Sequence, residues 1–319
     1  MLRELKNKIL AGGSALREEL LELVSADLEE LCQAAEELRD HFCGKVFHLC
    51  TVLNAKSGGC TENCKYCAQS LHYRTRVDSY PLKAESEILE EALENARRGA
   101  ERFSVVTSGR ALTEEEVERL CNVFRQIRQR SSIGLCASLG LLTQSQLIRL
   151  KEAGLTRYHN NLETSRRFFP QVCTTHTYDD KIRVMEALRR AGLEICSGGI
   201  IGLGESMEDR LDLALELRRQ GALFIPVNIL NPIPGTPLEK NPPLALEEIR
   251  RTVALFRFTL PQAAICLAGG RSLLTDHGLS VFQSGANAAI SGNLLTTCGI
   301  DIEDDLKTLS KLGFETKMP

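Results

Sequence analysis

Three cysteines in one short loop are the residues best suited to chemistry in this sequence. The segment SGGCTENCKYC places Cys60, Cys64 and Cys67 in a C-x₃-C-x₂-C arrangement directly after an apolar run. Three thiolates this close together can hold one iron–sulfur cluster and leave one iron without a protein ligand. A structural zinc site normally has four ligands, commonly as paired C-x₂-C units, and no suitable fourth ligand lies nearby. The loop therefore favours an iron–sulfur cluster with an open iron over structural zinc.

A second set of three cysteines lies on separate strand candidates. Cys136 in IGLC, Cys196 in EIC and Cys266 in AIC belong to the third, fifth and seventh of these strands. Alternate strands of a barrel contribute side chains to the same interior layer, so the three thiols can converge. Their convergence predicts a second metal site inside a barrel. The alternative, three small buried hydrophobic residues, would be favoured if the first cluster were absent.

The remaining cysteines and the overall composition limit the classes of function. We expect the other six cysteines to be structural or incidental, namely Cys32, Cys43, Cys50, Cys121, Cys173 and Cys298. The N-terminal segment carries scattered charges and no apolar signal region, and the uncharged stretch 220–238 contains four prolines, so we expect a cytoplasmic protein without membrane spans. A net charge of −3 argues against a basic nucleic-acid-binding surface.

The elements that must position these cysteines alternate along the chain. Residues 1–42 have helical periodicity, and Gly44 ends that region. Amphipathic helical runs cover residues 85–99, 113–130, 143–154, 177–192 and 207–221. Short β-rich apolar runs cover residues 46–53, 102–108, 133–139, 155–161, 193–201, 222–230, 263–269 and 285–292.

Eight strand candidates separated by helices predict a (β/α)₈ TIM barrel, an α/β fold, although an open doubly wound sheet would show the same alternation. We expect a helical extension over residues 1–43, followed by a single barrel domain with a C-terminal tail over residues 44–319.

The cluster loop resembles that of the radical S-adenosylmethionine (SAM) superfamily, in which an aromatic residue precedes the third cysteine. In that superfamily the open iron of a [4Fe–4S] cluster binds SAM, and one electron cleaves SAM to methionine and a 5′-deoxyadenosyl radical. The resemblance implies that Cys60, Cys64 and Cys67 hold this cluster and that Tyr66 packs beside the adenine.

Further segments resemble the biotin synthase family of that superfamily, which inserts sulfur into dethiobiotin. The similar segments are residues 58–70, 158–165, 196–205 and the pair 228–239 with 285–297. The resemblance implies dethiobiotin as substrate, an electron donor such as flavodoxin or ferredoxin, and a homodimer. It covers nearly the whole predicted barrel.

Polar residues at the strand ends suit such a substrate. Asn160, Asn161 and Glu163 follow the fourth strand candidate, at the barrel face where active sites form. Amides there can bind a neutral ureido ring, and a carboxylate can bind a ribose diol. The resemblance implies that Asn161 and Asn228 bind the substrate, and Asn160 is grouped with them as Asn161's neighbour. It implies that Glu163 binds the SAM ribose. For each residue taken alone, a strand-end hydrogen bond is the simpler interpretation.

Two more SAM contacts are implied. The glycine-rich segment around Gly199 and Ile200 would let the backbone approach a flat ligand. The family has a basic residue on the helix after the fourth strand for the SAM carboxylate, and the ungapped count places Lys181 there. A lysine offers a point charge without the bidentate fork of arginine. A solvated helix face is the alternative for this residue.

The second cysteine set departs from the family pattern. The best-known members hold a [2Fe–2S] cluster with three cysteines and an arginine. Here Ser104 occupies the place of the strand-two cysteine, and Cys266 occupies the place of the arginine. Three thiolates and a hydroxyl are similar to the auxiliary cluster of lipoyl synthase. We therefore predict an auxiliary [4Fe–4S]-type cluster held by Cys136, Cys196 and Cys266, with Ser104 nearby or coordinating.

Two other functions stay open. A radical SAM barrel acting on another small molecule, similar to methylornithine synthase or to the maturase of the diiron hydrogenase, would share the cluster loop. A non-catalytic iron–sulfur or zinc protein would leave the polar strand ends without an explanation.

Overall fold

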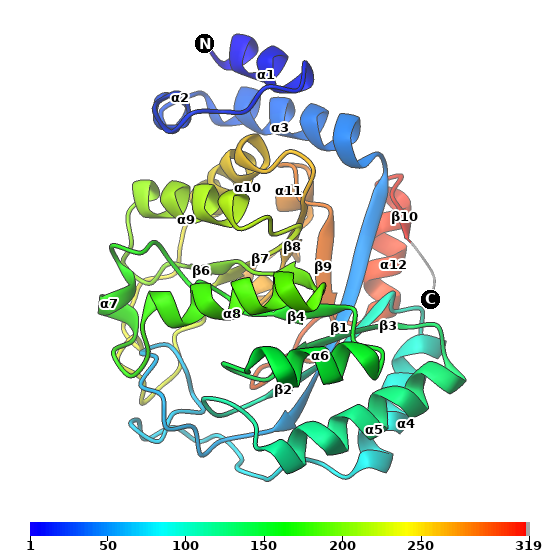
Figure 1. Ribbon diagram of the computed structural model, residues 1–319. Helices are drawn as coiled ribbons and strands as arrows, with labels where there is room; N and C mark the ends of the chain where they lie inside the picture. The colour runs from blue at the N-terminus through cyan, green and yellow to red at the C-terminus, as the bar shows by residue number, and fades with distance from the viewer. Residues whose placement is uncertain (317–319) are drawn as a thin grey trace.

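The computed structural model describes residues 1–316 and shows a closed parallel barrel of eight strand positions (Figure 1). The strands are β1 (Val46–Lys56), β2 (Arg102–Thr107), β3 (Gly134–Ser138), β4 (Arg157–His159), β5 (Glu194–Cys196), β6 (Gly199–Ile201), β7 (Phe224–Ile229), β8 (Ala264–Leu267) and β9 (Ala288–Ser291). The pairing of β9 with β1 closes the sheet and excludes the open doubly wound alternative. The predicted barrel is confirmed.

The fifth barrel position is divided into two short strands, where the sequence predicts one run. β5 and β6 both pair with β7, and Ser197 and Gly198 lie between them. At this break the Gly198 amide donates to the Asn161 side chain instead of to a strand backbone. The interruption therefore provides the backbone contact that holds one of the predicted substrate residues.

Helices surround the barrel and cover its strands. They are α4 (Glu85–Arg97), α5 (Glu114–Arg130), α6 (Gln144–Glu152), α7 (Phe169–Val172), α8 (Tyr178–Ala191), α9 (Met207–Arg219), α10 (Leu246–Thr259), α11 (Leu279–Phe282) and α12 (Ile302–Lys311). The short strand β10 (Glu315–Thr316) pairs with the start of β1. The helix starts expected at Thr113 and Thr143 are confirmed, because each side chain accepts a hydrogen bond from the third helical amide.

Helix α10 lies outside the predicted helical runs and is buried on two sides. Ile249 and Val253 pack with the main core, whereas Ala254, Leu255 and Phe258 pack with the N-terminal helices. α10 therefore contributes to both hydrophobic clusters and joins the N-terminal helices to the barrel.

Three helices form the N-terminal extension, as predicted for residues 1–42. They are α1 (Leu2–Leu10), α2 (Arg17–Leu23) and α3 (Leu28–Cys43). α3 packs along α10, and α2 packs against α9. In Figure 1 the extension lies at the end of the barrel where β1 begins, opposite the loop that follows β1. The domain boundary after residue 43 stays a prediction. Among residues 1–316, no helix has the length and apolar character that a membrane crossing requires.

A buried arginine connects α10 to the amino end of the barrel. The Arg257 guanidinium donates to the carbonyl oxygens of Ala263 at 2.7 Å and Gly285 at 2.8 Å, and to Asn287 Oδ1 at 2.8 Å. Arg257 is fully buried, and burial lowers its pKa to about 10.

We expect Arg257→Met to destabilise the protein strongly, because it leaves these buried oxygen acceptors without a donor. The loss should be about 3–5 kcal/mol of unfolding free energy. The matched control is Arg97→Met, which removes a 69% exposed arginine from α4 and should cost about 0.5 kcal/mol or less. Urea unfolding followed by circular dichroism measures both, and equal midpoints for the two variants would contradict the assignment.

Candidate active site

A large cavity opens at the carboxyl ends of the barrel strands and reaches into the barrel interior. Cys60, Cys64 and Cys67 line it, as do Cys136 and Cys196 on the strands. The three loop cysteines and two of the three strand cysteines, which the sequence places far apart, therefore face one continuous space. The segment 294–297 also lines this cavity and lies after β9, the last strand of the barrel.

The cluster loop is held in place by its own backbone. Cys60 donates its amide to Gln69 O at 3.1 Å and accepts from the Leu71 amide at 2.8 Å. Gly58 begins the turn with φ +68°, and a Cβ there would lie 2.7 Å from Ser79 Cβ. The turn therefore requires glycine, and it places the three thiols on the cavity side.

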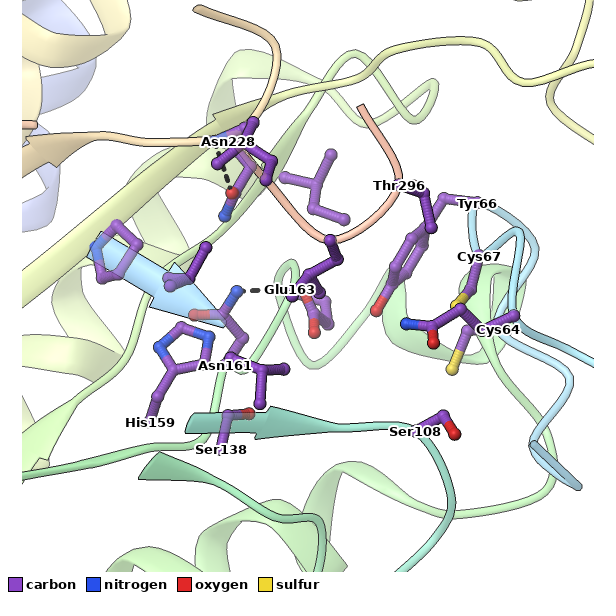
Figure 2. A pocket seen from close by; sticks show the side chains of 18 of the residues that line it. Cys64, Tyr66, Cys67, Ser108, Ser138, His159, Asn161, Glu163, Asn228 and Thr296 are labelled. Atoms are coloured by element: carbon purple, nitrogen blue, oxygen red, sulfur yellow. Dashed lines mark hydrogen bonds between the residues drawn. The ribbon is translucent and has the colours of Figure 1, made fainter. Parts of the chain in front are cut away.

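The residues predicted to contact SAM gather beside the loop. Tyr66, Glu163, Lys181 and Ile200 all line the cavity. Figure 2 shows Tyr66 and Glu163 facing the same space as Cys64 and Cys67. Burial raises the pKa of Glu163, and the charge of Lys181 and hydrogen bonds from Tyr66 and Asn161 oppose that rise. Glu163 has φ +69°, an uncommon conformation for a residue with a side chain.

The segment around Gly199 packs closely against neighbouring backbone, and its predicted contact with SAM stays a prediction. A Cβ at Gly199 would lie 2.4 Å from Glu163 O, and one at Gly198 would lie 1.9 Å from Pro226 O. Gly199 is not among the residues that line the cavity. These glycines therefore allow close approach of neighbouring protein backbone, and the close approach lets the Ile200 amide donate to Glu163 O at 2.8 Å.

Two of the three predicted substrate asparagines face the cavity. Asn161 accepts from the Gly198 amide at 2.8 Å and donates to Glu163 Oε2 at 3.3 Å. Asn228 accepts from the Gly269 amide at 2.9 Å and donates to Gly199 O at 3.1 Å. Both side chains are thus held in one orientation by backbone groups, and both point toward the centre of the view in Figure 2.

Asn160 lies outside the cavity lining, unlike the other two asparagines that were predicted to bind substrate. Its side chain donates to Lys181 O at 2.9 Å, and it is not among the cavity-lining residues. Successive residues at the end of a strand point to opposite faces, so Asn160 and Asn161 cannot both enter the barrel. Asn160 makes the simple strand-end hydrogen bond that was the alternative for it.

The barrel interior contains one more cysteine than the sequence analysis assigned there. Ser104, Cys136 and Cys196 line the cavity, whereas Cys266 is fully buried and does not line it. Cys50 also lines the cavity and packs in one buried cluster with Cys196 and Cys266. Its position on the first strand is a signal of the same kind as the positions of the other three cysteines on the third, fifth and seventh strands.

Basic and imidazole groups surround these thiols. The Arg102 Nη1 atom lies 3.9 Å from Cys136 Sγ, and Arg157 stacks on the Phe224 ring at 4.3 Å. His159 Nδ1 lies 3.2 Å from Cys196 Sγ, and burial lowers the pKa of His159 to about 4. The thiol group is therefore flanked by two cations and a neutral imidazole.

A further group beside the cluster loop was also missed. Cys173, for which the sequence suggested no partner, lies 3.3 Å from His176 Nδ1. The ligand atoms of Cys64, Cys173 and His176 lie within 4.8 Å of one another, and His176 also contacts Glu62. The Cys-x₂-His spacing was the available signal for this contact.

The donor types in this cavity fit two iron–sulfur clusters. All twelve cysteines are free thiols. Two buried guanidinium atoms beside the inner thiols, Arg102 Nε and Arg157 Nη1, have no hydrogen-bond partner in the described structure. A buried N–H without an acceptor is costly, and a cluster with thiolate ligands would provide an anionic acceptor there.

Two family models match consecutive parts of the chain. Residues 54–217 match the model of the Radical SAM superfamily, and residues 226–315 match the model of the Biotin and Thiamin Synthesis associated domain. The chain is therefore a radical SAM enzyme.

Full-length relatives identify the branch of that superfamily. The chain is 54% identical over 314 residues to the biotin synthase of Akkermansia muciniphila, with 98% of each chain covered. It is 53% identical over 310 residues to that of Clostridium botulinum, with 97% of this chain and 98% of the relative covered. The chain belongs to the biotin synthase family.

Solved structures with lower identity support the fold alone. Methylornithine synthase superposes with a TM-score of 0.86 at 18% identity, covering 98% of this chain and 97% of that one. A maturase of the [FeFe]-hydrogenase superposes with a TM-score of 0.84 at 18% identity, covering 100% of this chain and 75% of that one.

Proposed function

We propose that this enzyme converts dethiobiotin to biotin by radical SAM chemistry, with the inserted sulfur taken from an auxiliary iron–sulfur cluster inside the barrel. The observation that carries the proposal is the 54% identity to a biotin synthase over almost the full length of both chains. The continuous cavity supports it, because one space contains a cluster loop, polar strand ends and inner thiols.

The residues near the cavity mouth are arranged to bind SAM. Cys60, Cys64 and Cys67 would hold the [4Fe–4S] cluster, and Tyr66 would pack beside the adenine. Glu163 would accept the ribose hydroxyls, because its carboxylate lies in the cavity and its backbone is fixed by the Ile200 amide. Lys181 would supply the positive charge for the SAM carboxylate.

The amide side chains are arranged to bind a neutral ureido ring. Asn161 and Asn228 each keep hydrogen-bonding capacity toward the cavity after their backbone contacts are made. Because those contacts fix both side chains, the substrate does not have to order them on binding. The segment containing Leu294 and Thr296 covers the same cavity and would exclude water from the reacting carbons.

The inner thiols would hold the auxiliary cluster. Cys136, Cys196 and Cys266 are its proposed ligands, and Ser104 lies beside Cys136 in the register of β2 and β3. We propose a four-iron cluster, because the thiolate of Cys266 occupies the strand-seven position where the best-known members have an arginine. When bound, the two clusters supply the electron that cleaves SAM and the sulfur that enters the substrate.

A flavodoxin or ferredoxin as electron donor, and a homodimer, complete the proposal from the family resemblance. A radical SAM enzyme acting on another small molecule is the second candidate, the alternative that an activity measurement must exclude.

The reaction itself separates the two candidates. Anaerobically purified enzyme incubated with SAM, dithionite or reduced flavodoxin, and dethiobiotin should form both biotin and 5′-deoxyadenosine, measured by mass spectrometry. Omission of dethiobiotin should lower deoxyadenosine formation. Deoxyadenosine formation without any biotin would favour the second candidate.

Asn161 and Asn160 form a matched pair for the substrate site. Asn161→Ala should raise the KM for dethiobiotin about 10- to 100-fold, because a buried polar contact to the substrate is lost. Asn160→Ala should leave that KM within about threefold, since its side chain bonds to the backbone of α8. Initial rates over a range of dethiobiotin concentrations measure both. A larger effect at Asn160 would reverse the assignment.

Iron analysis tests the auxiliary cluster. A chain with two four-iron clusters should contain about eight irons and eight sulfides, and its Mössbauer spectrum should show four-iron components alone. About six irons per chain with a two-iron component would refute the four-iron assignment and leave the SAM cluster in place.

A further inference from the structure

The register of the closed barrel places four cysteines, not three, at one height. In a barrel of this type, an inward-facing residue shares its layer with one residue on every second strand. Cys50 pairs with Arg102, and Arg102 pairs with Gly134. The inward-facing residue two positions beyond Gly134 is Cys136. Following the pairing across two strands and then advancing two residues along the chain therefore leads from one cysteine to the next.

The same step repeats around the barrel. Cys136 pairs with Arg157, which pairs with Glu194, and two residues further lies Cys196. The remaining pairs are Cys196 with Phe224, Phe224 with Ala264, Cys266 with Ala288 and Ala288 with His48. Two residues beyond Ala264 lies Cys266, and two residues beyond His48 lies Cys50. The path closes on itself, as a barrel of eight strands and a shear of eight requires.

Ser104 does not belong to this layer. The same rule places Ser104 in a layer with His159, Pro226 and Ile290. These four inward-facing residues come from the four strands that carry none of the ring cysteines. All four of these residues line the cavity. This group lies directly above the cysteines, toward the carboxyl ends of the strands. The hydroxyl of Ser104 is therefore outside the ring of thiols, whereas Cys50 is a member of it.

The layer directly below the thiols contains two arginines. The same rule groups Arg102, Arg157, Phe224 and Ala288 there. Each of the two guanidinium groups has one buried nitrogen without a partner in the described structure. Glu194 Oε2 lies 3.0 Å from Arg157 Nε and 3.7 Å from Arg102 Nη2, so the charges of the two arginines are already paired. Their unpartnered N–H groups would instead donate hydrogen bonds to the sulfur atoms of a bound cluster.

We propose that Cys50 is the fourth thiolate ligand of the auxiliary cluster, together with Cys136, Cys196 and Cys266, and that Ser104 is not a ligand. This inference rests on the proposed function, because it assumes that an auxiliary cluster is bound. On binding, each of the four thiols loses its proton and its sulfur binds one iron. The four ligands come from β1, β3, β5 and β8, one from every second strand of the closed barrel.

The test uses full-length protein in which the SAM cluster is removed, so that auxiliary iron can be counted alone. The parent is the triple variant C60A/C64A/C67A, reconstituted anaerobically and desalted. It is compared with the same protein carrying Cys50→Ala, Ser104→Ala or Cys121→Ala. Cys121 is the matched control, because it is also a buried cysteine but lies on α5, outside the barrel interior. Circular dichroism checks that each variant is folded.

The parent should contain about four irons and four sulfides per chain. Cys50→Ala should lose more than half of this iron, or keep it with one iron site that is distinct in the Mössbauer spectrum. Ser104→Ala and Cys121→Ala should match the parent. If Cys50→Ala does not fold, Cys50→Ser preserves size, and its hard oxygen ligand should make one iron site distinct.

Two results would overturn the inference and are distinguishable. Unchanged iron content and an unchanged Mössbauer spectrum in Cys50→Ala, or loss of iron in Ser104→Ala instead, would refute the role of Cys50 and leave the auxiliary cluster intact. A parent that binds no iron would refute the auxiliary cluster itself, and with it the proposed source of sulfur.

Discussion

The closed parallel register of the barrel is the constraint on which the site depends. Because β9 pairs with β1, each strand has a neighbour on both sides and none can slip by a residue without breaking two ladders. A slip of one residue would also turn every inward side chain outward. The closure of the barrel therefore sets which residues face the interior and also sets the height of each of them along the barrel axis.

The site is consequently ordered along the barrel axis. Arginines lie below the thiols, and Ser104 and His159 lie directly above them. Continuing the same spacing places Asn161 and Asn228 at one level higher up, about 8 Å above the thiols for a rise of about 3.3 Å per residue and a tilt of about 36°. Glu163 and the cluster loop follow at the mouth. A small substrate held by the asparagines would therefore span the space between the SAM site and the inner thiols.

The sequence predicted the barrel, the cluster loop and most cavity residues because those features depend on local patterns and short spacings. The sequence could not predict features that depend on the long-range register of the strands. Asn160 and Asn161 are equally polar neighbours, and only strand parity shows that one faces α8 and the other faces the cavity. Gly199 has the composition of a ligand-binding turn, yet the atom it accommodates is the Glu163 carbonyl oxygen. Cys50 has no motif around it, and its place beside the other inward-facing cysteines becomes visible once its height relative to the other strands is known.

The departures from the family pattern have a common geometric meaning. In the best-known pattern the cysteines belong to strands two, three and five, so the ligand set spans two interior layers, as suits a small planar cluster. Here the strand-two position is Ser104, and thiols occur at Cys50 and Cys266, so the proposed ligand set lies in one layer on four alternate strands. A ring of four thiols around one axis matches the four irons of a cubane better than the two irons of a rhomb. The exchange of Ser104 and Cys266 is thus best understood together with Cys50, as one change from a two-layer site to a one-layer site.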